Sequence, residues 1–278
     1  GYTAKPPEAG TDVFAMDTGN NSYPSFTSNF PVDFGVLRRP TTSENWWNGA
    51  RLMGKNALRF NGTEAEVDDS NITFDRNDGW YGGGGGNKGS SYQSWMWKRY
   101  AGCDVVAYEG NNQGNRRIPH SMNKTVEMIW VKNRDSGYDW QVWHKDLTSG
   151  KHLILNSNGA ETNSNSPGLG SVSATHFSVG SYVAVNGNNS KYIAMLFASV
   201  NGISKLGNWV GDGGTQTITL GFQPRFLVFK TWNTGGGWYV LDTTRGWGAG
   251  NDASMQFQES NAQVSGRDDG APTATGFT

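Results

Sequence analysis

The 278-residue sequence has little cysteine, little charge and no long apolar run. Its one cysteine, Cys103, cannot form an intrachain disulfide and stands in the strand-like run CDVVAY, so we expect a small buried side chain without redox chemistry. Charged residues are 17% of the chain and the formal net charge is −1, which argues against the basic surface of a nucleic-acid binder. The longest apolar run, 192–199, is too short to span a bilayer, and residues 1–30 show no signal-peptide pattern.

Helical periodicity is also missing, because no stretch places apolar residues at i, i+3 and i+4 over three turns between caps. The sequence is instead rich in glycine, with 39 residues, and in aromatic residues, at 13%. Short apolar runs of valine, isoleucine and aromatic residues alternate with clusters of Gly, Asn, Asp, Ser and Thr. This pattern predicts an all-β globular chain of short strands and turns with very little helix.

The sequence repeats itself at a spacing of about 100 residues. The runs VDFGVLR from Val32, VEMIWVK from Val126 and PRFLVFK from Pro224 each end in a basic residue, and a tryptophan follows eight positions later. These pairs are Arg38 with Trp46, Lys132 with Trp140, and Lys230 with Trp238. Each pair spans a polar loop between two strand-like runs, so we expect a hairpin that brings the basic residue near the tryptophan.

Further blocks extend the repeat on both sides of these hairpins. The runs ALRFNGTEAEV, HLILNSNGAET and SMQFQESNAQV align without gaps and place Ala65, Ala160 and Ala262 in register. Upstream, each copy has a strand-like run that ends in a glycine turn: VFAMDTG, VVAYEG and LGNWVG. Downstream, SYQSWMW matches KYIAMLF at an offset of 100, and one preceding slot holds Phe74, Phe177 and Phe277.

The blocks divide the chain into unit 1 (residues 1–101), unit 2 (residues 102–201) and unit 3 (residues 202–278). We expect each unit to be an antiparallel β-sandwich of the jelly-roll or concanavalin-like type. In unit 2 the run VEMIWVK is apolar on both faces, so this strand should be covered on both sides. Its two faces are Val126, Met128 and Trp130 on one side and Ile129 and Val131 on the other.

Unit 3 reaches Thr278 before the counterpart of the strand that begins near Tyr192 in unit 2. An open sheet edge invites pairing with another strand. We therefore expect the missing strand to come from residues beyond Thr278 or from a neighbouring chain, and we expect a homo-oligomer.

Six segments carry a family resemblance: PVDFGVLRR, SWMWKRYAGCDVVAYEGNN, VEMIWVKNR, DWQVWHK, KYIAMLFASVNGISKLGNWVGDGG and LGFQPRFLVFK. They resemble tandem β-sandwich repeats in virion proteins of tailed phages of marine bacteria, including cyanophages. The likeness covers most of residues 12–278 and implies a structural protein on the virion surface, without a catalytic residue to carry over. Unit 1 departs from the pattern, because Gly35 stands where Ile129 and Leu227 stand in the other units, which predicts a bulge or a different contact.

Catalytic and metal-binding patterns are weak. Acidic residues stand mostly alone in turns, and no nucleophile elbow, phosphate-binding loop or dinucleotide motif occurs. The four histidines, His120, His144, His152 and His176, share no metal-ligand spacing. The glycine run Gly82–Gly86 lacks the lysine and helix of a phosphate loop and predicts a flexible loop. We predict no catalytic residue, no metal and no cofactor; calcium at GDGG from Gly211 or DDG from Asp268 is the alternative, without regular ligand spacing.

Tryptophans in loops with asparagine and glycine are the best binding candidates, because aromatic faces stack on sugars and amides bond to hydroxyls. These tryptophans are Trp46, Trp47, Trp80, Trp209, Trp232 and Trp247. The repeated Trp46, Trp140 and Trp238 are expected to maintain packing. Trp80, Trp232 and Trp247 have no tryptophan counterpart in the other units, so we predict that they contact a ligand. Asn233 and Asn251 are the nearby amides.

Three functions remain open. The first, which the family resemblance implies, is a structural virion protein in a tail fibre or appendage, which attaches multivalently to a host-surface glycan or protein. The alternative is a capsid decoration or head-fibre protein that contacts mainly other virion subunits. The third is a polysaccharide depolymerase. The first two differ in their partners, which lie outside this sequence, and neither involves nucleic acid, membrane insertion or turnover.

Overall fold

The computed structural model describes residues 7–83, 88–165, 167–248 and 250–278. The chain is all-β, and in these ranges α1 (Val183–Asn186) is the only α-helix. Single turns of 3-10 helix are η1 (Gly10–Asp12), η2 (Arg51–Met53) and η3 (Thr243–Arg245). None of the helices described has the length and apolar content that a membrane span needs. Most of the Gly82–Gly86 run lies outside the described residues, and the expected flexible loop with it.

The strands form two antiparallel sheets in each unit. Unit 1 contains β1 (Phe14–Thr18), β2 (Phe26–Thr27), β3 (Phe34–Arg38), β4 (Trp47–Ala50), β5 (Asn56–Arg59), β6 (Val67–Asp68), β7 (Ile72–Thr73), β8 (Gly79–Gly82) and β9 (Gln93–Trp97). Unit 2 contains β10 (Cys103–Glu109), β11 (Arg116–Pro119), β12 (Met128–Asn133), β13 (Gln141–His144), β14 (Leu153–Ile154), β15 (His176–Val179) and β16 (Lys191–Phe197). Unit 3 contains β17 (Ile218–Thr219), β18 (Phe226–Phe229), β19 (Tyr239–Asp242), β20 (Asp252–Gln256), β21 (Val264–Arg267), β22 (Pro272–Thr273) and β23 (Gly276–Phe277).

The repeated segments occupy the same topological position in each unit. The larger sheets have the orders β1-β9-β3-β4-β5-β6, β10-β16-β12-β13-β14 and β18-β19-β20-β21. The smaller sheets are β2-β8-β7, β11-β15 and β17-β23-β22. β3, β12 and β18 each form an antiparallel hairpin with the next strand, and β9 and β16 pair with the other edge of β3 and β12. The described part of unit 3 has no strand at this last position.

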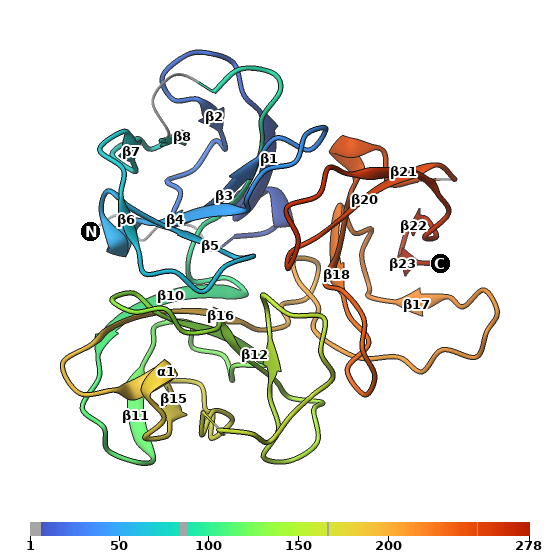
Figure 1. The fold of residues 1–278 in the computed structure, drawn as a ribbon. Coiled ribbons are helices and arrows are strands. Elements are labelled where there is room, and N and C mark those ends of the chain that lie inside the picture. The colour runs from blue at the N-terminus through green and yellow to red at the C-terminus, as the bar shows by residue number, and fades with distance from the viewer. Residues whose placement is uncertain (1–6, 84–87, 166, 249) are drawn as a thin grey trace.

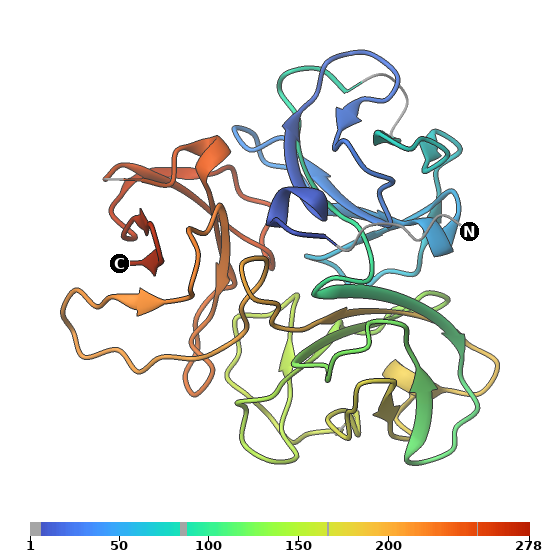
Figure 2. The same cartoon turned by 180° about the vertical axis from the view of Figure 1, so that it is seen from behind.

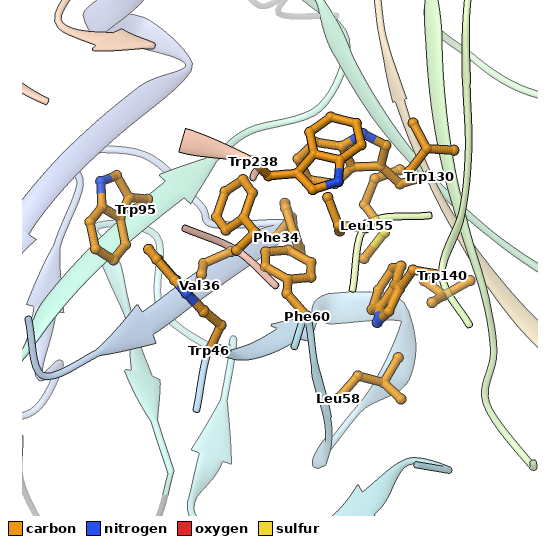
Figure 3. Close-up of a cluster of buried hydrophobic side chains, with 14 of the residues drawn as sticks. Phe34, Val36, Trp46, Leu58, Phe60, Trp95, Trp130, Trp140, Leu155 and Trp238 are labelled. Carbon is orange, nitrogen blue, oxygen red and sulfur yellow. The ribbon is translucent and has the colours of Figure 1, made fainter. Parts of the chain in front are cut away.

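The larger sheets of the three units face a common centre, so the units form one body around a shared core (Figures 1 and 2). Buried side chains from all three units meet there, and Figure 3 shows many of them. The aligned residues Phe60, Leu155 and Phe257 lie in this core, and the rings of Phe60 and Phe257 are 5.0 Å apart. The sandwiches are therefore joined more closely than a string of tandem modules would be.

The repeated tryptophans close this ring of units. The indole nitrogen of Trp46 donates to the carbonyl of Gln256 in unit 3, at 2.8 Å. In the same way Trp140 donates to Arg59 of unit 1 at 2.7 Å, and Trp238 donates to Ile154 of unit 2 at 2.9 Å. Trp46 and Trp140 are fully buried and Trp238 is 5% exposed, so each repeated tryptophan packs in the core and satisfies its donor on the neighbouring unit.

A second set of backbone bonds follows the aligned alanines. The residue after each alanine donates its N–H to the next unit, and each of these three bonds measures 2.7 Å. The donor and acceptor pairs are Glu66 with Arg134, Glu161 with Trp232, and Gln263 with Pro40. Unit 1 thus bonds to unit 2, unit 2 to unit 3, and unit 3 back to unit 1. The pseudo-threefold ring is closed by backbone as well as by side chains.

The repeated basic residues lie next to their hairpin loops. Arg38 donates to the carbonyls of Ser260 and Asn261 at 3.1 and 2.7 Å, and its guanidinium lies 4.7 Å from the ring of Trp46. Lys132 donates to Ser136 O at 3.0 Å, and Lys230 donates to Gly236 O. Burial lowers the pKa of Lys132 and of Lys230 to about 8. These side chains bind loop carbonyls and belong to the packing.

Unit 1 contains no bulge at Gly35, which stays in register with Gly49 and Met96. A β-carbon at Gly35 would lie only 2.5 Å from the indole of Trp80, so the glycine makes room for this ring. Trp80 faces Phe26 across β2 and β8, as Phe177 faces Ile118 in unit 2 and Phe277 faces Ile218 in unit 3. The counterpart of Phe177 and Phe277 is therefore Trp80, and the alignment that placed Phe74 in this slot is wrong.

Two local expectations about strands are also wrong. Met128 and Trp130 face the shared core and Ile129 and Val131 face the core of unit 2, as expected, but Val126 precedes the strand and packs on the unit 2 side. The run LGNWVG, 206–211, forms no strand and is mostly exposed. It has lost its β-sheet partner, because β1 and β10 pair with β9 and β16, and unit 3 has no counterpart of these strands in its described residues.

Candidate functional site

A pocket of about 290 Å³ opens in unit 1 between the two sheets. Leu37, Ala57, Ile72 and Trp80 contribute apolar surface to it. The other polar and aromatic residues around it are Glu44, Trp47, Asn48, Asp68, Asp69, Lys88 and Tyr92. We call this cavity the unit 1 pocket. Apolar walls with a few polar groups are the usual composition of a small-ligand site.

Strand alternation explains how one of these residues reaches the pocket. Trp46 and Trp47 are consecutive, so their side chains leave the strand on opposite faces. Trp46 enters the shared core. Trp47 lies opposite Leu37 in the register and packs on the other face of the sheet, against the separate core of unit 1. Asp68 lies in the edge strand β6, and Tyr92 immediately precedes β9.

Cations lie against both aromatic rings of the unit 1 pocket. The guanidinium of Arg59 is 4.5 Å from the ring of Trp47, and the ammonium of Lys88 is 4.7 Å from the ring of Tyr92. Arg39 also approaches Tyr92, at 5.5 Å, and is paired with Glu44 at 2.7 Å. Burial lowers the pKa of Lys88 and raises the pKa of Tyr92. These contacts orient the rings before a ligand arrives.

The arrangement can bind a polar ligand. Carboxylates at Asp68 and Asp69 can accept hydrogen bonds from hydroxyls, the ammonium of Lys88 can donate, and the two aromatic rings offer apolar surface. Within the described ranges, no group of three or more His, Cys, Asp and Glu side chains could hold a metal ion. The calcium candidate at Asp212 is an exposed turn whose Oδ1 accepts from the N–H of Gly214, at 2.8 Å.

Trp80, which we predict to contact a ligand, lies in the core of unit 1 and in the wall of the unit 1 pocket. It is fully buried, its indole nitrogen donates to Ser94 Oγ at 3.0 Å, and its ring stacks on Phe74 with centroids 5.2 Å apart. The ring contributes only to the inner wall of the unit 1 pocket. Trp80 replaces a phenylalanine of the other units because Gly35 leaves space for the larger ring.

Trp247 is also a core residue, which corrects the second of these predictions. It is 3% exposed, donates to Gly270 O at 3.0 Å and packs on Phe277. Trp232 is partly buried against the shared core. Asn233 and Asn251 are exposed. Trp80 lies in unit 1 and the other four residues lie in unit 3, so the predicted ligand residues do not form one site.

Sequence reasoning named Trp47 among the loop tryptophans but missed its partners in the unit 1 pocket. Asp68 and Asp69 are two of the acidic residues that the sequence places in turns, and no sequence pattern marks Tyr92 or Lys88. The doubled tryptophan was the available clue, because adjacent strand residues face opposite sides and the shared core can hold only one of them. Cys103 is buried as expected, and burial raises the pKa of its thiol.

Comparison with known proteins adds one finding. No curated protein and no solved structure matches the chain. One family model matches residues 15–277, which is most of the sequence and all three units of the ring. The chain therefore belongs to the family described as Domain of unknown function (DUF7483).

Proposed function

We propose that the chain is a non-catalytic attachment module whose unit 1 pocket binds one sugar ring of a surface glycan. The observation that carries this proposal is the meeting of Trp47 and Tyr92 with Asp68, Asp69 and Lys88 around one opening. The volume, about 290 Å³, is at the lower end for small-ligand sites, which suits a single ring better than a long oligosaccharide.

The setting that the sequence resemblance suggests is the surface of a tailed-phage virion, in a tail fibre or appendage. The low net charge suits recognition by stacking and hydrogen bonds. Trp47 is the first residue of β4, and the same position holds Gln141 in β13 and Tyr239 in β19. The other units therefore have no tryptophan at this place. Each chain would therefore offer one such pocket, and multivalent attachment would require several chains on one particle.

The test is attachment of the purified protein to host cells and to immobilised glycans. We expect the double variant Trp47→Ala, Tyr92→Ala to lose binding at least about tenfold, because one lost aromatic contact alone contributes about 1 kcal/mol. The matched control is Trp209→Ala, which removes a tryptophan that is 39% exposed in unit 3.

Because Trp47 and Tyr92 are partly buried, a second variant, Asp68→Asn, removes a charge from an exposed position without changing size. It should weaken binding while the melting temperature stays within a few degrees of wild type. Unchanged attachment in both variants contradicts the proposal. Release of sugar fragments from the glycan would instead support the depolymerase.

A further inference from the structure

The unit 1 pocket is apolar at its buried end. Four of its residues are apolar and each at most 3% exposed: Leu37, Ala57, Ile72 and Trp80. We call these four residues the inner wall. Asp68 is exposed and Asp69 is half-buried, so the carboxylates of the pocket lie closer to solvent. A ligand that fits both ends is apolar on one side and polar on the other.

The side chains of the inner wall offer no hydrogen-bond partner to a ligand. Three of them are aliphatic, and the indole nitrogen of Trp80 already donates to Ser94 Oγ at 3.0 Å. Asn48 also lines the pocket, but its register partners Val36 and Leu58 belong to the shared core, so its side chain points to the opposite face of the sheet. A hydroxyl that a ligand buries against the inner wall would lose its hydrogen bonds to water without replacement.

The polar end of the pocket suits the hydroxyls of a sugar ring. The carboxylate of Asp68 can accept hydrogen bonds, and the ammonium of Lys88, which lies 4.7 Å from the ring of Tyr92, can donate them. When the hydroxyls on C2 and C3 of a hexose meet these groups, C5 and C6 on the opposite side of the ring face the inner wall. A hydroxyl on C6 would be buried there without a partner, whereas a methyl group would be stabilised by leaving water.

The methyl group of an N-acetyl sugar fits this end less well. An amide N–H and C=O stand between that methyl group and the sugar ring, and both need partners when they are buried. The side chains of the inner wall provide none. The C6 of a 6-deoxyhexose carries no polar group, so its burial leaves no donor or acceptor on that carbon unsatisfied.

Two small residues of the pocket distinguish unit 1 from unit 2. Ala57 aligns with His152 of unit 2. Gly82 is the last residue of β8, and Val179 is the last residue of the matching strand β15. His152 is 2% exposed and Val179 is fully buried, so unit 2 packs larger side chains at both positions. The apolar end of the pocket is therefore a feature of unit 1 and not of the repeat.

We propose that the unit 1 pocket selects a 6-deoxyhexose, whose methyl group lies on the inner wall while its ring hydroxyls bond to Asp68 and Lys88. This inference rests on the proposed function, because it names the class of sugar for the same pocket. It adds that a single group, the substituent on C6, decides which sugar binds.

The probes are pairs of sugars that differ only at C6: D-fucose with D-galactose, L-fucose with L-galactose, and L-rhamnose with L-mannose. N-acetyl-D-glucosamine and D-glucose form a further pair for the N-acetyl group. Competition measured by saturation-transfer NMR on the purified protein gives the relative affinities and identifies the sugar protons that contact the protein. We expect the 6-deoxy member of at least one pair to bind about 10- to 100-fold more tightly than its hexose, with the strongest saturation on its methyl protons.

Two variants at Ala57 separate polarity from size. Ala57→Ser adds a hydroxyl to the inner wall, so a C6 hydroxyl gains a partner and the preference within the pair should fall about tenfold. Ala57→Cys is the matched control, because its thiol is of similar size and bonds weakly, so the preference should persist. Unit 3 has Ser254 buried at the aligned position, so the fold of the repeat accepts a serine here.

Failure of the inference and failure of the proposed function give different results. If both members of every pair bind equally, or if the N-acetyl sugar binds most tightly, the pocket binds sugars but the inference is wrong. A preference that Ala57→Ser leaves unchanged also overturns it, because the methyl group would then lie elsewhere. If no sugar of the panel binds at about 10 mM, the inference is overturned, and host-cell attachment of the Trp47→Ala, Tyr92→Ala variant decides the proposed function separately.

Discussion

β12 and β18 are the same strand of the repeat in two different surroundings. Both come from similar apolar runs, both form a hairpin with the next strand, and both present alternate residues to the shared core. Among the described strands β12 has a neighbour on each side and β18 has one neighbour. Most residues of β12 are buried, whereas those of β18 are half-buried. The local pattern thus determines that a strand forms, while its burial depends on which other strands are present.

Units 2 and 3 each bond to a neighbouring unit through their repeated tryptophan. Removing either tryptophan should therefore cause the largest losses of stability. Trp140→Ala and Trp238→Ala each remove a buried indole and a bond to the next unit, so each should lower the free energy of unfolding by about 3–5 kcal/mol. Because the core is shared, chemical denaturation should remain one transition. A small effect for Trp238→Ala alone would mean that unit 3 is loosely attached to the ring.

A smaller difference should separate the two strands. Ile129→Ala removes a fully buried side chain from β12 and should cost about 2–5 kcal/mol in stability. Leu227→Ala, at the matching position of β18, removes a half-buried side chain and should cost clearly less. Urea unfolding of both variants gives the comparison. If the two losses were equal, the open edge of β18 would be covered in solution.

The parts of the fold that could be predicted from the sequence are those that its repeats contain. Three copies of one pattern predicted the hairpins, the packing role of the repeated tryptophans and the strands β9 and β16. It could not show that the units share a core. The groups that accept the bonds between units, such as the carbonyls of Gln256 and Arg59, belong to the backbone, and a residue of any type has such a carbonyl.

The candidate site was harder for a physical reason. A tryptophan without a counterpart, such as Trp80, can equally fill a space that a smaller residue leaves, here Gly35, and the partner is visible only in three dimensions. The unit 1 pocket gathers residues from strands that are far apart in sequence. Trp47 was the one pocket residue with a clue in the sequence, because it directly follows the repeated Trp46.

The smallest expected effect compares the buried lysines of the two units as pH rises. Burial lowers the pKa of Lys132 from 10.5 to about 8, so between these values the unfolded chain binds more protons than the folded chain. Stability therefore rises with pH in this window. From pH 7 to pH 9 the gain from Lys132 is about 1 kcal/mol, because one pKa unit corresponds to about 1.4 kcal/mol. The pKa of Lys230 in unit 3 is also lowered to about 8, so Lys230 should contribute a similar gain. Urea unfolding of Lys132→Met and Lys230→Met across this range measures both slopes, and the two variants should remove similar parts of the rise. A clearly larger loss of slope in one variant would show that its unit encloses the lysine more tightly than the other unit does.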